Sequence, residues 1–301
     1  MRLHYHLLDV FSDRQFGGNQ LAVFPDPPRD LPAKTMQQIA KELNLSETTF
    51  VFPPADPAAD FRLRIFTPAA ELPMAGHPTV GTAYLLARLG ALGRIAEATT
   101  IVFQEGIGPI AVTVRADERG EPRDVWMEQP IPQFLGIYQD RASIAAMLSL
   151  TVSDLQDGAP IQVLSGGLPF LFIVLNSLGA VQKIRLRLDL WAERLAGTPA
   201  ANIFATTTET VCEDSTVHSR MFAPALGISE DPATGSASGP LGAYLLKNGL
   251  APSGDMVSEQ GFEIGRPSFI QIRVRRNGDD FSHVAIGGRC AYVGNGTLVI
   301  A

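Results

Sequence analysis

The sequence repeats itself at about half its own length, and this feature constrains the fold more than any other. It reads Arg-Ile-Phe-Thr-Pro at residues 64–68 and Arg-Met-Phe-Ala-Pro at residues 220–224. Each copy continues through a glycine-rich stretch into an apolar segment that ends in Ala-Tyr-Leu-Leu, at residues 83–86 and 243–246. The chain is therefore predicted to contain two copies of one domain, with a site between them built from two faces of common origin.

A second match follows each apolar segment and extends the two copies. Val-Phe-Gln-Glu-Gly at residues 102–106 corresponds to Val-Ser-Glu-Gln-Gly at residues 257–261, and alternating apolar residues follow both. A length of 301 residues also favours about two domains. We therefore predict a first repeat over residues 1–128 and a second over residues 129–301, with the last strand free to pack back on the first domain.

Composition and charge exclude several classes of protein. The net charge is −7 and no basic cluster offsets it, which argues against nucleic acid and anionic membrane as partners. The two cysteines, Cys212 and Cys290, form no disulfide framework, so we expect a reducing compartment. Neither a signal peptide nor a membrane-spanning apolar run is present. These features predict a soluble, cytoplasmic protein.

The pattern of apolar residues predicts many strands and few helices. Residues 79–89 and 237–246 are almost wholly apolar, and helices that are apolar all round are buried. Strands and helices do not alternate as a doubly wound sheet requires. We predict an α+β fold of two pseudo-symmetric domains, each a mostly antiparallel sheet rolled around a central buried helix.

The start of each central helix is the first candidate site. Glycine lets the backbone approach a ligand at Gly76 and Gly235, and His77 and Ser236 follow them. The first turn of a helix presents free N–H groups and the positive end of the helix dipole, which suit a carboxylate. For either copy taken alone, an ordinary capped helix is the alternative. The occurrence of the same motif in both copies favours a site.

Differences between the copies separate residues of the fold from residues of the chemistry. Positions kept in both copies are expected to serve folding. These are Arg64 with Arg220, Glu71 with Glu230, and Gly76 with Gly235. Polar positions that differ between the copies are better candidates for the chemistry. His77 aligns with Ser236, Asp231 aligns with Leu72, and Glu47 aligns with Ala201 or Ile203, depending on the register. The site is therefore predicted to be asymmetric.

Two carboxylates and a histidine beside a buried anion-binding position suit proton transfer. A carboxylate between apolar walls has a pKa raised towards the working pH, where it can both take and return a proton. Each residue also has a structural alternative, because Glu47 follows Ser46 in a possible turn, and Asp231 and His77 each precede a proline and could cap a helix. The prediction depends on their coincidence.

Long motifs of the chain resemble the PhzF-type phenazine biosynthesis isomerases. The resemblance covers nearly the whole sequence, at residues 44–51, 64–68, 71–79, 230–237 and 260–268. It implies a fold like that of diaminopimelate epimerase, usually a homodimer, with no cofactor. It also implies an isomerase in which a glutamate moves a proton between carbons of a small carboxylic acid.

The resemblance assigns roles to particular residues of this chain. Glu47 matches the glutamate that transfers the proton, and the supporting histidine, aspartate and serine of the family fall on His77, Asp231 and Ser236. Substrate-binding positions are expected at Ser46, Gly76, Gly235 and Asn19. One departure lies beside Asn19, where the family often reads Gly-Asn-Pro and this chain has Gln20.

Other mechanisms fit the sequence less well. Cys212 and Cys290 lie outside the repeated motifs, which argues against a two-cysteine racemase. Residues 235–239 have alanine where a serine hydrolase has its nucleophile. His4 and His6 lack a third metal ligand nearby, so no metal is expected. A catalytically silent protein of the same fold that binds a small acid stays open as the alternative to an isomerase.

Overall fold

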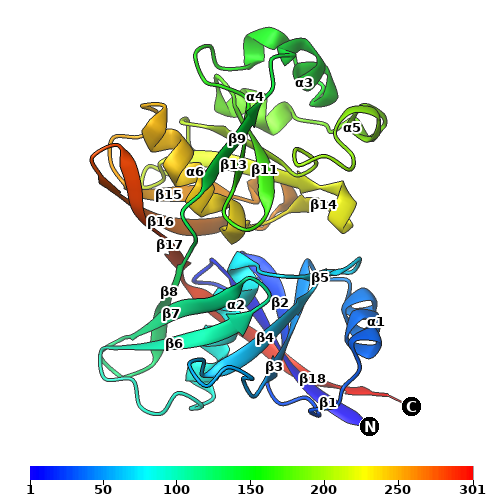
Figure 1. The fold of residues 1–301 in the computed structure, drawn as a ribbon, viewed down its shortest axis with the longest axis vertical. Coiled ribbons are helices and arrows are strands. Elements are labelled where there is room, and N and C mark those ends of the chain that lie inside the picture. Colours follow the sequence, from blue (N-terminus) through cyan, green and yellow to red (C-terminus); the bar gives the residue numbers. More distant parts are fainter. Residues whose placement is uncertain (301) are drawn as a thin grey trace. The chain divides into compact units, whose positions relative to one another are not determined.

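A computed structural model describes residues 1–300 of the chain, which divide into two compact units. The first unit comprises Met1–Glu128 and the segment from Ala285 onward, and the second comprises Gln129–Val284. The end of the chain thus packs with the first unit, as the prediction for the last strand allows. The reason is that β18 (Cys290–Val299) pairs along its whole length with β1 (Arg2–Val10), beside which it runs in Figure 1.

The first unit is a mixed sheet around one central helix, α2 (Gly76–Arg88). Its neighbouring strands are antiparallel except for two parallel pairs, β2 with β3 and β4 with β6. Its other elements are β2 (Asn19–Phe24), α1 (Ala33–Leu43), β3 (Glu47–Phe52), β4 (Phe61–Phe66), β5 (Glu71–Leu72), β6 (Ala98–Glu105), β7 (Gly108–Ala116) and β8 (Pro122–Glu128).

The second unit repeats this plan around α6 (Gly235–Lys247). Its two parallel pairs are β11 with β12 and β13 with β15. Its other elements are β9 (Gln133–Ile137), α3 (Arg141–Met147), β10 (Gln162–Ser165), β11 (Pro169–Val174), α4 (Leu178–Lys183), α5 (Leu188–Arg194), β12 (Ile203–Thr207), β13 (Val217–Ala223), β14 (Ile228–Asp231), β15 (Asp255–Gln260) and β16 (Ser268–Asn277), with three short 3-10 turns at Val152–Asp154, Pro224–Leu226 and Phe262–Ile264. Strand β17 (Asp280–Gly288) leads from this unit into the first.

The expected fold class is confirmed. The parallel pairs occupy the same places in both units, and the hairpins around them, such as β3 with β4 and β12 with β13, are antiparallel. Both central helices have 13 residues, of which the first 12 are buried in α2 and the first 11 in α6. A helix that is apolar all round can be stable only in such a position.

Small residues allow α2 to lie close to the sheet. A side chain added at Gly81 would place its Cβ 2.6 Å from Leu21 and 2.6 Å from Val10. Such a contact is far inside van der Waals distance, so this position requires glycine. A hydrogen bond between the Thr49 and Thr82 hydroxyls, 3.0 Å long and buried, joins β3 to the same helix. The strand that begins at Glu47 is thus fixed against α2.

Strand pairing settles which residues of the two units correspond. Phe66 pairs with Thr48 and Phe222 pairs with Ile203, so Thr48 and Ile203 are equivalent. The residue before each is then Glu47 in the first unit and Asn202 in the second. Our alignment of Glu47 with Ala201 or Ile203 was therefore wrong, because it was made along the sequence without the register of the hairpin. The same counting confirms that Leu72 is equivalent to Asp231.

The matched arginines and glutamates form matched ion pairs. In the first unit, Arg64 binds Glu71 through two hydrogen bonds of 2.7 Å. In the second, Arg220 binds Glu230 through bonds of 2.8 and 2.7 Å. Each arginine also lies over the ring of the phenylalanine two residues later, at 5.2 and 5.1 Å. The prediction that these conserved positions serve the fold agrees with this geometry.

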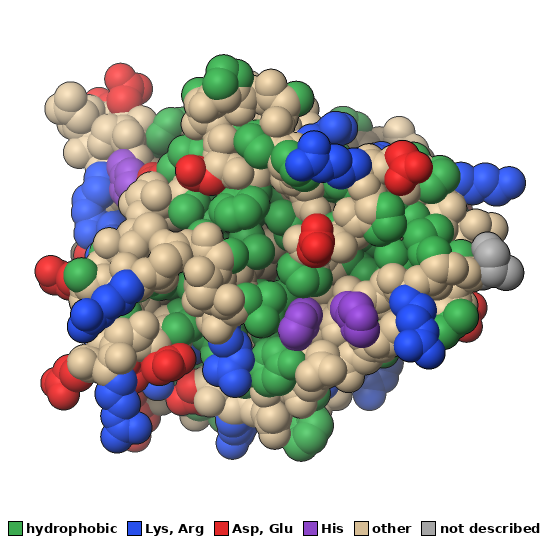
Figure 2. Space-filling view, turned by 90° about the horizontal axis from the view of Figure 1, so that it is seen from below, with side chains coloured by type: hydrophobic (Ala, Val, Ile, Leu, Met, Phe, Trp, Pro, Cys, Tyr) green, Lys and Arg blue, Asp and Glu red, His purple; other side chains and the backbone are tan. Residues whose placement is uncertain are grey.

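The surface carries charges of both signs. Figure 2 shows acidic and basic side chains scattered over one face, with two histidines next to each other. His4 and His6 each contact a hydroxyl group, His4 that of Thr297 at 2.8 Å and His6 that of Tyr292 at 3.1 Å. No helix within residues 1–300 is long and apolar enough to cross a membrane.

Candidate active site

Glu47 begins β3 and is buried, with 7% of its surface exposed. It lies beside Leu21 of β2, in one of the two parallel pairs of the first unit. Its Oε2 atom is 3.3 Å from Nε2 of His77, the second residue of α2. A buried carboxyl group at a strand end, facing a histidine at a helix start, is an arrangement found at sites of proton transfer.

His77 is held from its other side by Asn19. The side-chain nitrogen of Asn19 lies 3.1 Å from Nδ1 of His77, and both residues are buried. Asn19 is the first residue of β2, next to the strand that carries Glu47. Three of the predicted site residues, from three elements, thus meet in one buried cluster of the first unit.

Burial determines the charge of the histidine. Burial lowers the pKa of His77 to about 3, and a hydrogen bond with the backbone of Gln20 opposes this only partly. The ring is therefore neutral near pH 7 and carries a single N–H. The side-chain nitrogen of Asn19 can only donate, so Nδ1 accepts and the N–H of the ring lies at Nε2, which faces Glu47. This geometry suits Glu47 as a carboxylate.

The first turn of α2 is open to an anion. Its N-cap residue, Ala75, has extended backbone and offers no side chain as a cap. Gly76 is the first helical residue and is buried. The start of α2 is therefore not an ordinary capped helix, because no side chain occupies the cap position. Ser46 lies half-buried in the turn just before Glu47.

The corresponding helix start in the second unit is built differently. Asp231 ends β14 and is buried, and it accepts a hydrogen bond of 2.6 Å from the Thr234 hydroxyl. Gln260 binds the same loop, because its amide donates to the backbone oxygen of Asp231 at 2.7 Å and to the Thr234 hydroxyl at 3.0 Å. Its side-chain oxygen accepts from the Thr234 N–H at 3.1 Å. These bonds fix the position of the Asp231 carboxylate.

Ser236 and Gly235 lie where the sequence predicted them, in the first turn of α6. Gly235 is the first residue of the helix, and its carbonyl oxygen accepts a hydrogen bond of 3.1 Å from Gln129. Ser236 follows and is 7% exposed. No side-chain hydrogen bond caps this helix either. Neither central helix therefore has a side-chain cap at its start.

The departure at Gln20 leaves the cluster intact. Gln20 pairs with Asp9 between β2 and β1, and its own surface is exposed. Its contact with His77 is made by the backbone. A change of side chain at this position therefore does not remove the contact.

Sequence reasoning missed the supporting roles of Thr234 and Gln260. Both residues occur in the motifs that carry the resemblance, but only the structure shows that they bind Asp231. The available signal was the second repeated motif, where Gln-Glu at residues 104 and 105 becomes Glu-Gln at residues 259 and 260. Such an exchange of amide and carboxyl groups marks positions where the side chains of the two copies differ in chemistry.

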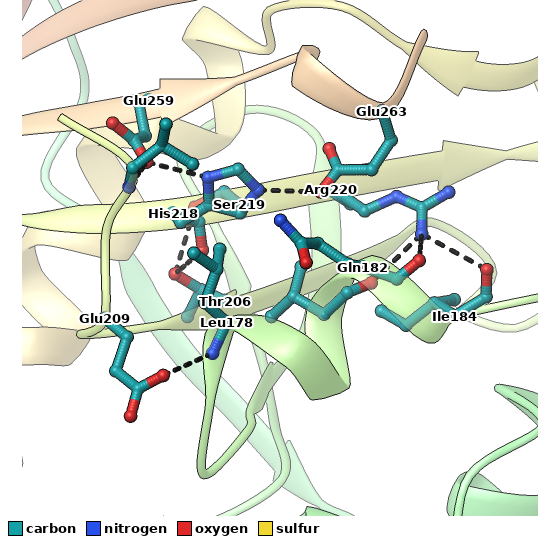
Figure 3. A network of polar contacts seen from close by, with 12 residues as sticks. Leu178, Gln182, Ile184, Thr206, Glu209, His218, Ser219, Arg220, Glu259 and Glu263 are labelled. Atoms are coloured by element: carbon teal, nitrogen blue, oxygen red, sulfur yellow. Dashed lines mark hydrogen bonds and ion pairs between the residues drawn. The ribbon is translucent and has the colours of Figure 1, made fainter.

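A second histidine cluster, drawn in Figure 3, belongs to the fold of the second unit. His218 lies between Glu259 and Glu263, at 2.8 and 2.9 Å. Burial lowers the pKa of His218, but the hydrogen bonds to both glutamates outweigh it and raise the pKa to about 9. Glu259 also accepts from the backbone N–H groups of Val211 and Cys212. The protonated ring therefore neutralises a buried charge that anchors a loop.

No group of three or more His, Cys, Asp or Glu side chains within residues 1–300 is arranged to hold a metal ion. The cysteines lie away from both helix starts, with Cys290 buried and Cys212 partly exposed in a loop.

Comparison with known proteins identifies the family. The sequence model described as phenazine biosynthesis-like protein matches residues 8–296, so the chain belongs to this family. An uncharacterized isomerase of Mesorhizobium japonicum is 36% identical over 304 residues, covering 99% of both chains. The trans-2,3-dihydro-3-hydroxyanthranilate isomerase of Pseudomonas chlororaphis is 36% identical over 298 residues, again 99% of both. The chain is thus an isomerase, as the resemblance implied.

Solved structures agree with this assignment. A phenazine biosynthesis protein of the PhzF family from Bacillus anthracis has a TM-score of 0.87 and 28% identity, with 100% of both chains covered. A predicted epimerase from Pseudomonas aeruginosa has a TM-score of 0.83 and 33% identity, covering 99% of this chain and 100% of that one. A probable proline racemase, at 12% identity and a TM-score of 0.68, shares the fold alone.

Proposed function

We propose that this isomerase moves a proton between two carbons of a small cyclic carboxylic acid, with Glu47 as the only proton carrier and no cofactor. The observation that carries the proposal is the buried contact of 3.3 Å between Glu47 and the neutral His77. Relatives named trans-2,3-dihydro-3-hydroxyanthranilate isomerase act on such an acid. A general acid-base group of this kind contributes a factor of about 10² to 10⁴ in rate.

In the proposed reaction, Glu47 takes the proton from one carbon and returns it to another. His77 stays neutral and donates from Nε2 to Glu47 while the carboxyl group is ionised. Asn19 orients the ring through its contact of 3.1 Å with Nδ1. The contact of 3.3 Å is somewhat long, and such contacts commonly shorten when substrate binds.

The carboxylate of the substrate is proposed to bind the first turn of α2 at Gly76, next in sequence to His77, whose ring lies 3.3 Å from Glu47. The uncapped N–H groups of that turn support this assignment. A helix start contributes at most about 2 kcal/mol to anion binding, whereas micromolar affinity needs about 8 kcal/mol. Other contacts must therefore supply most of the affinity and the specificity.

The second repeat is proposed to contribute Asp231, Ser236 and Gly235 to the same reaction. This part of the proposal is supported by the internal duplication, by the family motif and by the fixed position of the Asp231 carboxylate. Homodimer formation and a cytoplasmic location stay predictions.

A screen for turnover separates the isomerase from a silent binding protein. Purified protein is incubated with trans-2,3-dihydro-3-hydroxyanthranilate and with a panel of small cyclic and amino carboxylic acids, and products are identified by NMR. We expect one acid to be isomerised, at a rate that a chelator does not change. Binding of an acid without conversion would favour the silent protein, and loss of activity with a chelator that a divalent metal restores would contradict a reaction without cofactor.

A further inference from the structure

A buried carboxyl group outside the proposed chemistry lies at the start of α2. Glu105 is the last residue of β6 and is 6% exposed. Its Oε1 atom is 2.6 Å from the hydroxyl of Thr79, in the first turns of α2, while its Oε2 atom has no hydrogen-bond partner within residues 1–300. The Thr79 hydroxyl is in turn 2.7 Å from the backbone oxygen of Ala75.

Counting hydrogens shows which state of Glu105 fits this geometry. Two short oxygen–oxygen contacts meet at Thr79, and each needs one hydrogen between its atoms. The Thr79 hydroxyl supplies only one hydrogen, and the Ala75 carbonyl oxygen can only accept. The Thr79 hydrogen therefore serves Ala75, and the second hydrogen must be on the carboxyl group of Glu105.

The second unit has an amide in the equivalent place. Strand pairing makes Glu105 equivalent to Gln260, because Arg62 pairs with Gln104 and His218 pairs with Glu259. The Gln260 amide donates to the hydroxyl of Thr234, the N-cap residue of α6, which corresponds to Ala75 and not to Thr79. The two side chains thus hold the start of their helix through different partners. A carboxylic acid resembles an amide in having one donor and one acceptor, whereas a carboxylate has acceptors only.

The glycine after each of these residues confirms that the two sites are alike. A Cβ added at Gly106 would lie 2.7 Å from Pro73, and one at Gly261 would lie 2.6 Å from the backbone oxygen of Pro232. Both prolines precede the central helix of their unit. In each unit the end of the strand is therefore packed tightly beneath the loop that leads into the helix.

We propose that Glu105 is a positioning residue that is protonated in the folded protein and that holds the first turn of α2, including His77, as Gln260 holds the corresponding turn of α6. The importance of this turn for the reaction depends on the proposed function. The protonation of Glu105 and its hydrogen bond with the start of α2 do not depend on that function.

The surroundings of Glu105 provide no charge to stabilise an anion. It takes part in no ion pair among residues 1–300, and its neighbour Gln104 is neutral. Arg62 and Arg64 of β4 and Glu71 of β5 line the same surface pocket, but Arg64 is bound by Glu71 and Arg62 is exposed. On α2, the titratable residue nearest in sequence to Thr79 is His77, which is neutral. Burial raises the pKa of Glu105 to about 8, which the hydrogen bond with Thr79 opposes only partly.

The most direct test follows the side-chain carboxyl carbons of the wild-type protein by ¹³C NMR as a function of pH. The Glu105 signal is identified by its absence from the spectrum of Glu105→Gln, and the exposed Glu118 serves as an internal control. We expect Glu105 to stay protonated at pH 7 and to ionise only near its raised pKa of about 8, well above an ordinary glutamate. Ionisation of Glu105 together with Glu118 would overturn the proposal.

The positioning role is tested by the ring signals of His77. In the wild type they should shift over the pH range in which Glu105 ionises, and in Glu105→Gln they should stay constant. His77 signals that ignore the ionisation of Glu105 would overturn the positioning role. This result is distinguishable from a failure of the proposed function, which would appear as full turnover in Glu47→Gln while the Glu105 titration is unchanged.

Stability provides a matched pair of variants. Because its pKa is raised, the contribution of Glu105 is fully present below about pH 4.5 and is lost as the pH rises through about 8. The equilibrium constant for unfolding of the wild type, divided by that of Glu105→Gln, should therefore rise over this pH range. The rise should be at most about tenfold per pH unit. Gln260→Glu should introduce the same dependence into the second unit. A ratio that does not change with pH in either variant would contradict the proposal.

Discussion

The two units share a backbone plan but differ at the start of the central helix. In the first unit a buried glutamate faces a histidine, at 3.3 Å. In the second, the equivalent positions carry Asn202 and Ser236, and the titratable group is Asp231, where the first unit has Leu72. Neither half alone holds all the groups expected in the reaction. The comparison shows how a duplicated fold can become asymmetric by exchanging a few side chains.

The matched ion pairs show the opposite case, in which one interaction is kept while its surroundings change. The side chains of Arg64 and Glu71 are 19% and 41% exposed, whereas those of Arg220 and Glu230 are 5% and 11% exposed. Arg220 also donates to the backbone oxygens of Val181, Gln182 and Ile184, at the end of α4, as Figure 3 shows. The same pair should therefore contribute far more to stability in the second unit.

The largest loss of stability is expected when this ion pair is broken in one unit at a time. Arg220→Met removes the partner of a buried carboxylate and leaves three carbonyl oxygens without their donor, so unfolding in urea should show a loss of about 3–5 kcal/mol. Arg64→Met should cost about 1 kcal/mol or less, since the pair is partly exposed. Equal losses in the two variants would contradict the difference between the units.

The next effect concerns pH. The raised pKa of His218 means that its contribution to stability is fully present below about pH 6.5 and is lost as the pH rises through about 9. His218→Gln should therefore flatten the fall in stability over this range, by about 1–3 kcal/mol. The equivalent residue of the first unit is the exposed Arg62, and Arg62→Gln should leave the profile within about 0.5 kcal/mol of wild type. Thermal unfolding from pH 6 to 10 tests both, and an unaltered profile in His218→Gln would show that the cluster of Figure 3 is not protonated.

The smallest effect on stability is expected for Asp231. The side-chain oxygen of an asparagine can still accept the hydrogen bond from Thr234, so Asp231→Asn should change the free energy of unfolding by about 1 kcal/mol or less. Glu230→Gln, next to it in sequence, should cost more because it leaves Arg220 without a full countercharge. If Asp231→Asn is the more destabilising of the two, divergence between the repeats is a poor guide to chemical residues.

The repeat in the sequence was sufficient to predict the fold, because apolar helices and alternating strands have patterns that depend on the sequence alone. A role in the fold was predicted for Arg64, Arg220, Glu71 and Glu230 from their repetition, whereas the pairing of arginine with glutamate within each unit needed the structure. Asn202 was missed, because the register of a hairpin depends on the lengths of loops. The protonation of Glu105 was also out of reach, since it results from burial and from one short contact with Thr79, made by strand packing.

The central claim is that Glu47 carries the proton, and exchange with deuterated water tests it most directly. When substrate and wild-type protein react in D₂O, the carboxyl hydrogen of Glu47 exchanges with solvent in a fraction of the turnovers before it is returned. The product should then contain deuterium at the carbon that receives the proton. Glu47→Gln should stay folded and bind the substrate, yet lose at least about 100-fold in both turnover and deuterium incorporation. Turnover and incorporation near the wild-type level in Glu47→Gln would contradict the account.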